Sequence, residues 1–174
     1  QIVTPVKGQV LCTMPLNDYF LPYGVTANDA NEYFIQRQTD KRVIMGGMSW
    51  RSDHEETTMD ESLLNERVGS GLRNYLQQLY GHFLSKNKTC QIDSFIDYEW
   101  TGLMAYSQDY LPLIGRVPFT KNAYMACGYS GNGMTMAFLA AKVVAEMILK
   151  QNNAETIQEF PFELLRPSRF FQTK

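Results

Sequence analysis

A glycine-rich segment near the C-terminal end holds the residues best suited to chemistry. It reads Gly128-Tyr-Ser-Gly-Asn-Gly-Met-Thr135, and it joins an apolar run that predicts a short strand, Tyr124 to Cys127, to a helical pattern that begins at Met134. The first N–H groups of a helix have no partner within the helix and lie at the positive end of its dipole. Glycines let another molecule approach that backbone closely. The segment therefore predicts a site for an anion or a polarised carbonyl oxygen, or else only a tight connection.

The order of these glycines argues against one common site. They run G-x-x-G-x-G, whereas the dinucleotide-binding turn of a Rossmann unit reads G-x-G-x-x-G. No second strand with an acidic end follows, because the chain after Lys150 is polar and then interrupted by prolines. We therefore do not interpret the segment as the pyrophosphate-binding start of a Rossmann unit.

Hydrolytic and metal chemistry have little support in the residue types. The only histidines are His54 and His82, and the three cysteines, Cys12, Cys90 and Cys127, form no C-x-x-C pair. A metal site is therefore not expected, and a serine or cysteine nucleophile would lack a nearby base. Reduced thiols are the default inside cells, so we expect a cytoplasmic protein.

Composition and charge limit the partners. The chain has 174 residues, of which 44% are hydrophobic, and a net charge of −2 without a block of like charges. Neither nucleic acid nor a membrane surface is an expected partner, and no apolar run reaches the roughly 18 residues of a membrane span. No signal peptide opens the chain, and its start at Gln1 rather than Met indicates a piece of a longer product.

The elements that must position the glycine segment are mostly strands. Strand patterns occupy 8–14, Glu32 to Gln38, Arg42 to Met45 and 91–106, and a proline-centred turn is expected at 110–115. The middle two predict a hairpin, with Gly46 and Gly47 ending its second strand. Because the strands are clustered, the fold class is α+β, with a mainly antiparallel sheet and flanking helices.

Two helices are predicted. The first runs over 58–84, with Thr58 and Glu61 as a capping box and with Gly69 and Gly71 marking a kink or a close contact. The second follows the glycine segment. Its apolar stripe is predicted at Met134, Ala137, Phe138, Ala141, Val144, Ala145, Ile148 and Leu149. Residues 151–174 are expected to form an extended arm whose aromatic side chains another domain covers.

Three motifs in this order resemble the C-terminal part of the FAD-dependent amine and amino-acid oxidoreductases. They are Val3 to Gln9, Trp100 to Gly115 and Gly128 to Thr135. That family includes glycine oxidase, D-amino acid oxidase, sarcosine oxidase and γ-glutamylputrescine oxidoreductase. The resemblance implies a substrate-domain-like region over 1–115, the strand, turn and helix of an FAD-binding domain over 116–150, and a tail over 151–174. The family's N-terminal G-x-G-x-x-G half, the Rossmann half, is absent from these residues.

The resemblance also implies site residues and substrate. It assigns FAD binding to Gly128, Tyr129, Ser130, Gly131, Asn132, Gly133, Met134 and Thr135. The family's substrate-gripping arginine lies in a Gly-Leu-Arg-Pro segment, which here reads Gly102-Leu-Met-Ala105, and no flavin-linking cysteine stands nearby. We therefore expect non-covalent FAD and a substrate closer to a polyamine than to a simple amino acid. Pocket walls are predicted at Trp50, Trp100, Met104 and Tyr106, which are equally suited to a core; no catalytic side chain is identified.

Three functions stay open. In the first, the chain is the substrate and flavin-ring portion of an FAD-dependent oxidoreductase that transfers hydride from a small amine or amino acid to flavin. In the second, it is a non-catalytic binding module related to such enzymes. In the third, it is a subunit completed in trans by another chain with the N-terminal FAD-binding half. The fragment by itself is not expected to be active.

Overall fold

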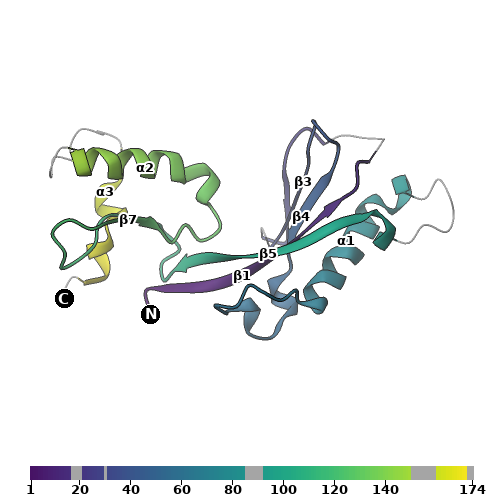
Figure 1. Ribbon diagram of the computed structural model, residues 1–174, viewed down its shortest axis with the longest axis horizontal. Helices are drawn as coiled ribbons and strands as arrows, with labels where there is room; N and C mark the ends of the chain where they lie inside the picture. Colours follow the sequence, from purple (N-terminus) through teal and green to yellow (C-terminus); the bar gives the residue numbers. More distant parts are fainter. Residues whose placement is uncertain (17–20, 30, 85–91, 150–159, 172–174) are drawn as a thin grey trace. The chain divides into compact units, whose positions relative to one another are not determined.

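The computed structural model describes residues 1–16, 21–29, 31–84, 92–149 and 160–171 (Figure 1). The chain divides into two compact units. Gln1–Pro5 and Met104–Lys174 form one, called here the turn unit, and Val6–Leu103 form the other, called the sheet unit. The boundary between them falls within a strand, between Leu103 and Met104. The domain division at residue 115 stays a prediction.

The core of the sheet unit is a five-stranded sheet with strand order β2-β3-β4-β1-β5 (Figure 1). The strands are β1 (Val3–Thr13), β2 (Val25–Ala27), β3 (Glu32–Gln36), β4 (Val43–Gly47) and β5 (Ile96–Ser107). The β1–β4, β2–β3 and β3–β4 pairs are antiparallel. The predicted hairpin is therefore confirmed, and so is an antiparallel sheet accompanied by helices.

The second strand of the hairpin extends two residues beyond the predicted Met45 and ends at Gly47. Gly46 and Gly47 belong to β4 and pair with Tyr33 and Glu32 of β3. A Cβ at Gly46 would collide with the Tyr33 hydroxyl, and one at Gly47 would collide with the Asn31 carbonyl. The glycines therefore permit close packing against β3 as well as forming the end of β4.

A long helix, α1 (Glu66–Leu84), packs against one face of this sheet (Figure 1). It buries Val68, Leu72, Leu76 and Tyr80 against Leu11, Phe34, Val43 and Met45. The predicted start at residue 58 is wrong, because Asn65 is the residue whose Oδ1 accepts the Arg67 N–H, at 3.0 Å, as an N-cap side chain does. The close contact predicted at the helix glycines is confirmed at Gly71, where a Cβ would lie 2.9 Å from Met48 Sδ.

Short 3-10 helices complete the sheet unit: η1 (Ser49–Arg51), η2 (Asp53–Glu56) and η3 (Ile92–Phe95). The last of these occupies the start of the region predicted as strand 91–106, and β5 begins only at Ile96. None of the helices in the described part of the chain is long and apolar enough to cross a bilayer.

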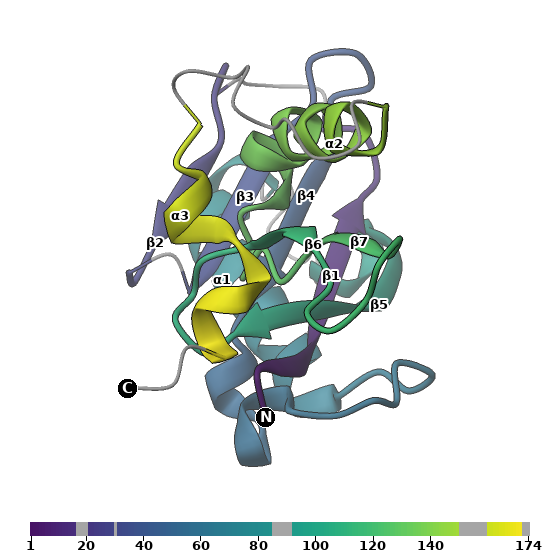
Figure 2. The same ribbon diagram turned by 90° about the vertical axis from the view of Figure 1, so that its left-hand side faces the viewer.

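The turn unit is a two-stranded hairpin packed against helices (Figures 1 and 2). Its elements are β6 (Leu113–Arg116), β7 (Tyr124–Cys127), α2 (Gly133–Leu149), α3 (Phe162–Leu165) and η5 (Pro167–Phe171). The strand predicted at Tyr124 to Cys127 is confirmed. Residues 113–115 were expected in a turn and are instead strand, because they pair with β7. The chain's N-terminus joins this unit through the Gln108 N–H, which donates to the Ile2 carbonyl at 2.9 Å.

The expected extended arm is also corrected where the structure describes it. Residues 162–171 form α3 and η5, and Leu165 is buried beside Ile114 of β6. Phe160 and Phe162 pack against the same core, whereas Phe171 is 47% exposed. Cover of the exposed aromatic side chain by another domain stays a prediction. The remainder of the predicted arm, 151–159 and 172–174, lies outside the described residues.

Helix α2 presents the opposite face from the one predicted. Ala140, Val143 and Met147 are buried against the hairpin. The predicted stripe is instead largely exposed, with Met134 at 99% and Phe138 at 87%. The helix thus carries two apolar faces, of which its own unit covers one.

Candidate functional site

The glycine segment is a turn held in place by a serine pair. Ser130 has the left-handed φ of 51°, rare for a residue with a side chain, and is only 8% exposed. Its N–H donates to the Ala105 carbonyl at 3.0 Å, and its Oγ accepts the Ser107 N–H at 3.2 Å. These bonds to β5 stabilise an otherwise unfavourable backbone conformation. The conformation of the turn is therefore fixed by hydrogen bonds to β5.

The residues after Ser130 lead directly into α2. The Asn132 N–H donates to the Tyr129 carbonyl at 2.8 Å, and the Thr135 Oγ1 donates to the Asn132 carbonyl at 2.9 Å. The helix then begins at Gly133, with no acidic residue in its first turn. The positive end of the helix dipole therefore lies at the turn, without a carboxylate of its own first turn to neutralise it.

Gly131 gives the turn an open side. It is exposed and has a φ of 86°, a conformation that glycine adopts readily. A Cβ at this position would have one neighbour within 4 Å among the described residues, the Tyr106 Oη at 3.3 Å. At Gly133 a Cβ would lie 3.7 Å from Tyr129, an ordinary contact. The close approach that glycine permits is therefore concentrated at Gly131.

Tyr106 lies beside this turn and is the predicted pocket residue that the structure places most clearly. Its backbone bridges to Tyr129, and its half-buried ring meets Tyr110 edge to face with 6.3 Å between centroids. Burial, and secondarily the neighbouring Tyr110, raises the pKa of Tyr106. The phenol therefore keeps its proton at neutral pH and is available as a donor. Met104 is two residues earlier on β5 and shares its face.

The two predicted tryptophans belong to the sheet unit, and their contacts there are structural. The Trp50 indole Nε1–H donates to Oε1 of the fully buried Glu32 at 2.8 Å, and the Arg51 guanidinium carbon is 5.5 Å from the centre of the Trp50 ring. Trp100 packs on Tyr98 at 5.2 Å between ring centroids. A pocket formed by Trp50 and Trp100 with the turn-unit residues stays a prediction.

A bidentate ion pair that the sequence did not predict supports the turn unit. The Arg169 Nε and Nη2 donate to Asp109 at 2.7 and 2.9 Å. Arg169 also donates to the carbonyls of Leu111 and Leu165 at 2.8 and 2.9 Å. The hydrogen bond from Arg169 holds the pKa of the Asp109 carboxyl below its usual range. Sixty residues separate the partners, so no local spacing signals the pair.

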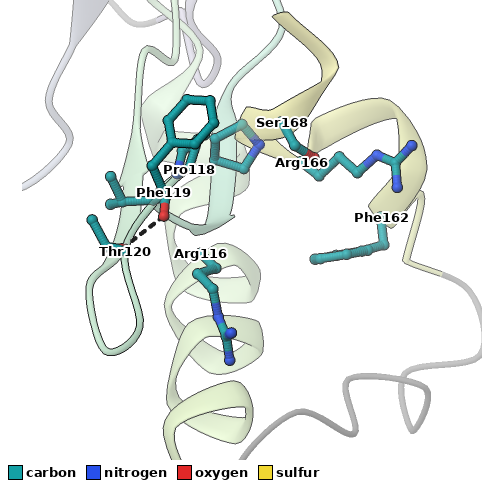
Figure 3. Close-up of a pocket in the computed structure, with 9 residues that line it drawn as sticks. Arg116, Pro118, Phe119, Thr120, Phe162, Arg166 and Ser168 are labelled. Atoms are coloured by element: carbon teal, nitrogen blue, oxygen red, sulfur yellow. Dashed lines mark hydrogen bonds between the residues drawn. The ribbon is translucent and has the colours of Figure 1, made fainter. Parts of the chain in front are cut away.

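A pocket of about 260 Å³ lies at the other end of the hairpin (Figure 3). It is lined by Arg116, Val117, Pro118, Phe119, Thr120, Phe162, Arg166, Pro167 and Ser168. Figure 3 shows the side chains of Arg116 and Arg166 directed to different sides, so the two charges do not converge. None of the predicted site residues lines this pocket. Among the described residues, no group of three His, Cys, Asp or Glu side chains is placed to hold a metal.

The part of the chain that contains the glycine turn is similar to known proteins. The family model described as FAD dependent oxidoreductase matches residues 1–147. A probable oxidoreductase OrdL of Haemophilus influenzae is 35% identical over 168 residues, which cover 90% of this chain and 32% of that protein. A glycine oxidase of Pseudomonas putida is 25% identical over 146 residues, covering 84% and 35%. The chain thus spans about a third of the length of these curated relatives.

Solved structures share the fold. Glycine oxidase from Geobacillus kaustophilus superposes with a TM-score of 0.72 at 17% identity, covering 97% of this chain and 40% of that one. L-proline dehydrogenase from P. horikoshii gives a TM-score of 0.68 at 23% identity with the same coverage. Iminodiacetate oxidase from Chelativorans gives 0.64 at 22% identity, with 95% and 40% covered.

Proposed function

The chain belongs to the FAD-dependent oxidoreductase family, and we propose that it forms the flavin-ring and substrate portion of an enzyme that oxidises a C–N bond of an amine or amino acid. The resemblance seen in the sequence motifs is confirmed, and FAD is the cofactor of the family. The observation that carries the proposal is the glycine turn, open at Gly131 and placed at the positive end of α2. When bound, FAD would supply the acceptor for the hydride of the substrate, which carries the two electrons of the oxidation.

The turn fits the pyrimidine edge of a flavin ring. We assign the backbone N–H groups of Gly131, Gly133 and Met134 to that edge, where negative charge develops on reduction. The Asn132 N–H, which the resemblance includes, already donates to the Tyr129 carbonyl and helps to shape the turn instead. Donors that are already oriented, at a helix N-terminus, stabilise such charge without reorganising. Ser130 maintains their orientation through its bonds to β5.

Binding of the cofactor is proposed to be non-covalent. Leu103 and Met104 occupy the place where a flavin-linking cysteine is expected, and Cys127 is on β7. Burial raises the pKa of the Cys127 thiol, so this group stays protonated and is a poor nucleophile at neutral pH.

The substrate is proposed to be an amine whose carboxylate is absent or distant from the reacting carbon. Met104 stands in the position of a carboxylate-gripping arginine and offers only an apolar, polarisable surface. Two other arginines are occupied elsewhere: Arg116 lines the pocket at the far end of the hairpin, and the Arg51 Nε donates to the Arg67 carbonyl at 3.2 Å. A buried carboxylate without a cation costs several kcal/mol.

The remaining parts of the enzyme are proposed to come from sequence outside these 174 residues. The curated relatives are about three times as long, which supports an FAD-binding half that precedes this chain in one polypeptide. Completion in trans by a second chain is the alternative, and the complete reading frame distinguishes the two. A non-catalytic module is not favoured, because the family match runs through both the substrate motif and the glycine turn. The cytoplasmic location stays a prediction.

Substrate kinetics of the complete protein test the proposal. We expect the purified protein to carry flavin, and a polyamine derivative to be oxidised at least about a hundredfold more efficiently, in kcat/KM, than glycine, sarcosine or D-alanine. The matched variant Met104→Arg should gain activity on the amino acids and lose it on the polyamine derivative. Efficient turnover of glycine by the unmodified enzyme would contradict the substrate assignment. A folded protein without affinity for FAD would contradict the cofactor site itself.

A further inference from the structure

One side chain beside the glycine turn has a polar group that the fold leaves unused. Within the described part of the chain the Tyr106 hydroxyl has no hydrogen-bond partner, although its ring is half-buried. The hydroxyl is not among the enclosed side-chain atoms that lack a partner, so it is accessible from outside the unit. A donor that is free of protein partners and accessible at the turn is able to bind a ligand that approaches the turn.

The surroundings of the hydroxyl indicate which ligand. Its oxygen is the group within reach of a Cβ at Gly131, at 3.3 Å, so it borders the open side of the turn. The ring itself is fixed, because Tyr106 bridges to Tyr129 through the backbone and meets Tyr110 at an interplanar angle of 86°. A fixed ring loses little conformational freedom on binding, so its O–H is a preorganised donor.

We propose that the Tyr106 hydroxyl donates a hydrogen bond to the pyrimidine edge of the flavin, next to the backbone N–H groups of the turn. This inference rests on the proposed function and adds a side-chain donor to it. The pKa of Tyr106 is raised by burial, which keeps the proton on the phenol across the neutral range. Tyr106 is thereby a cofactor-binding residue that raises flavin affinity and favours the reduced, more negative ring.

The variant Tyr106→Phe in the complete protein tests the inference. It keeps the ring contact with Tyr110 and removes only the hydroxyl, so folding should be maintained. We expect the Kd for FAD, measured by titration of the apoprotein, to rise about threefold to tenfold. The Kd for the reduced, more negative flavin should rise by about a further threefold to tenfold beyond that for the oxidised flavin. The two-electron midpoint potential of the bound flavin should therefore fall by about 14 to 30 mV, at 29.6 mV per tenfold.

Tyr110→Phe is the matched control. Tyr110 is 69% exposed, also carries a hydroxyl, and packs its ring on Tyr106. Loss of the Tyr110 hydroxyl should leave both the Kd for FAD and the midpoint potential of the flavin at the values of the unmodified protein. An unchanged Kd and potential in Tyr106→Phe, or an equal effect in Tyr110→Phe, would overturn the inference while leaving the flavin site intact. Lack of FAD binding by the unmodified protein would instead overturn the proposed function.

Discussion

Two neighbouring residues of the turn adopt left-handed backbone conformations by different means. Gly131 has a φ of 86° and needs no support, whereas Ser130, with a φ of 51°, depends on hydrogen bonds to Ala105 and Ser107. The distinction bears on substitution, because a side chain at residue 131 would meet both backbone strain and the Tyr106 hydroxyl. Backbone strain and the proposed approach of the cofactor therefore coincide at Gly131.

Gly131→Ala should lower the free energy of unfolding by about 1–2 kcal/mol, the cost of a left-handed conformation for a residue with a Cβ. It should also weaken FAD binding in the complete protein. Chemical denaturation of the apoprotein measures the first effect and flavin titration the second.

Gly133→Ala is the control for that change, because its Cβ would make only an ordinary contact with Tyr129. Equal destabilisation by the two substitutions would show that the left-handed backbone at residue 131 is not the cause.

At the same scale, sequence reasoning identified the turn but not the residues that hold it. The turn glycines are closely spaced and follow an apolar run, so the local sequence alone marks them. Ser107 and the pair of Asp109 with Arg169 act across long stretches of sequence, and a single sequence does not indicate which distant polar residues meet. Met104 and Tyr106 could be placed on one face because strand alternation is local.

Elements of the turn unit are joined by the ion pair of Asp109 with Arg169, which ties η5 to the turn after β5. Arg169 is only 12% exposed, so removal of its acceptor leaves a guanidinium with fewer partners in a poorly solvated place. Asp109→Asn should therefore cost about 1–3 kcal/mol of the free energy of unfolding at neutral pH.

The pH dependence of that loss has a defined direction. The folded state lowers the pKa of Asp109, so the ionised carboxylate stabilises the fold above its unfolded pKa of about 3.9. That contribution is lost as pH falls through the lowered pKa of the folded protein. Denaturation of the unmodified protein and of Asp109→Asn should be measured between about pH 7 and pH 2.5. The difference in their free energies of unfolding should be constant above about pH 4 and should narrow below it. A difference independent of pH would indicate a packing effect instead.

Helix α2 shows why its existence was predictable and its orientation was not. The helical period over 134–149 is strong, but apolar residues occupy two faces, and periodicity does not say which face the same unit covers. The sequence prediction selected the face that contains Phe138, which is 87% exposed in this chain. We attribute that face to contact with the proposed FAD-binding half.

Phe138→Lys tests this attribution. In the complete protein it should cost about 2 kcal/mol or more of the free energy of unfolding, because a buried phenyl ring is replaced by a charge. In the isolated 174-residue chain the same change should cost little.

The control Met147→Lys should destabilise both forms, because Met147 packs in the core of the turn unit itself. The denaturation midpoints of both variants, in the complete protein and in the isolated chain, are compared with those of the unmodified forms. A tolerant Phe138→Lys in the complete protein would show that the face stays uncovered.

For the whole molecule, the proposed division of labour predicts weak cofactor binding by this chain alone. It holds the turn for the flavin ring, but no G-x-G-x-x-G segment for the pyrophosphate lies in these residues. Titration calorimetry of the isolated chain with FAD should detect no tight stoichiometric binding, whereas the complete protein should bind tightly. A yellow isolated chain would contradict the prediction.

The overall class was predictable because clustered strands and two helical periods are local signals. Local patterns misplaced the start of α1 and the nature of residues 113–115. In the first case the cap is Asn65, whose Nδ2 also donates to Ser52 Oγ at 2.8 Å, a contact from another element. In the second, pairing with β7 outweighs the turn preference of Pro112 and Gly115. Tertiary contacts decided both.

The turn unit is assembled from two separated pieces of chain, since the Gln108 N–H meets the carbonyl of Ile2. A ribosome must therefore complete almost the entire chain before that unit can close, whereas the contiguous sheet unit emerges earlier. We expect amides of the sheet unit to gain protection first in pulse-labelled hydrogen exchange during refolding. Premature termination would then leave a folded sheet unit without the glycine turn, so that incomplete synthesis yields a product unable to hold the flavin ring.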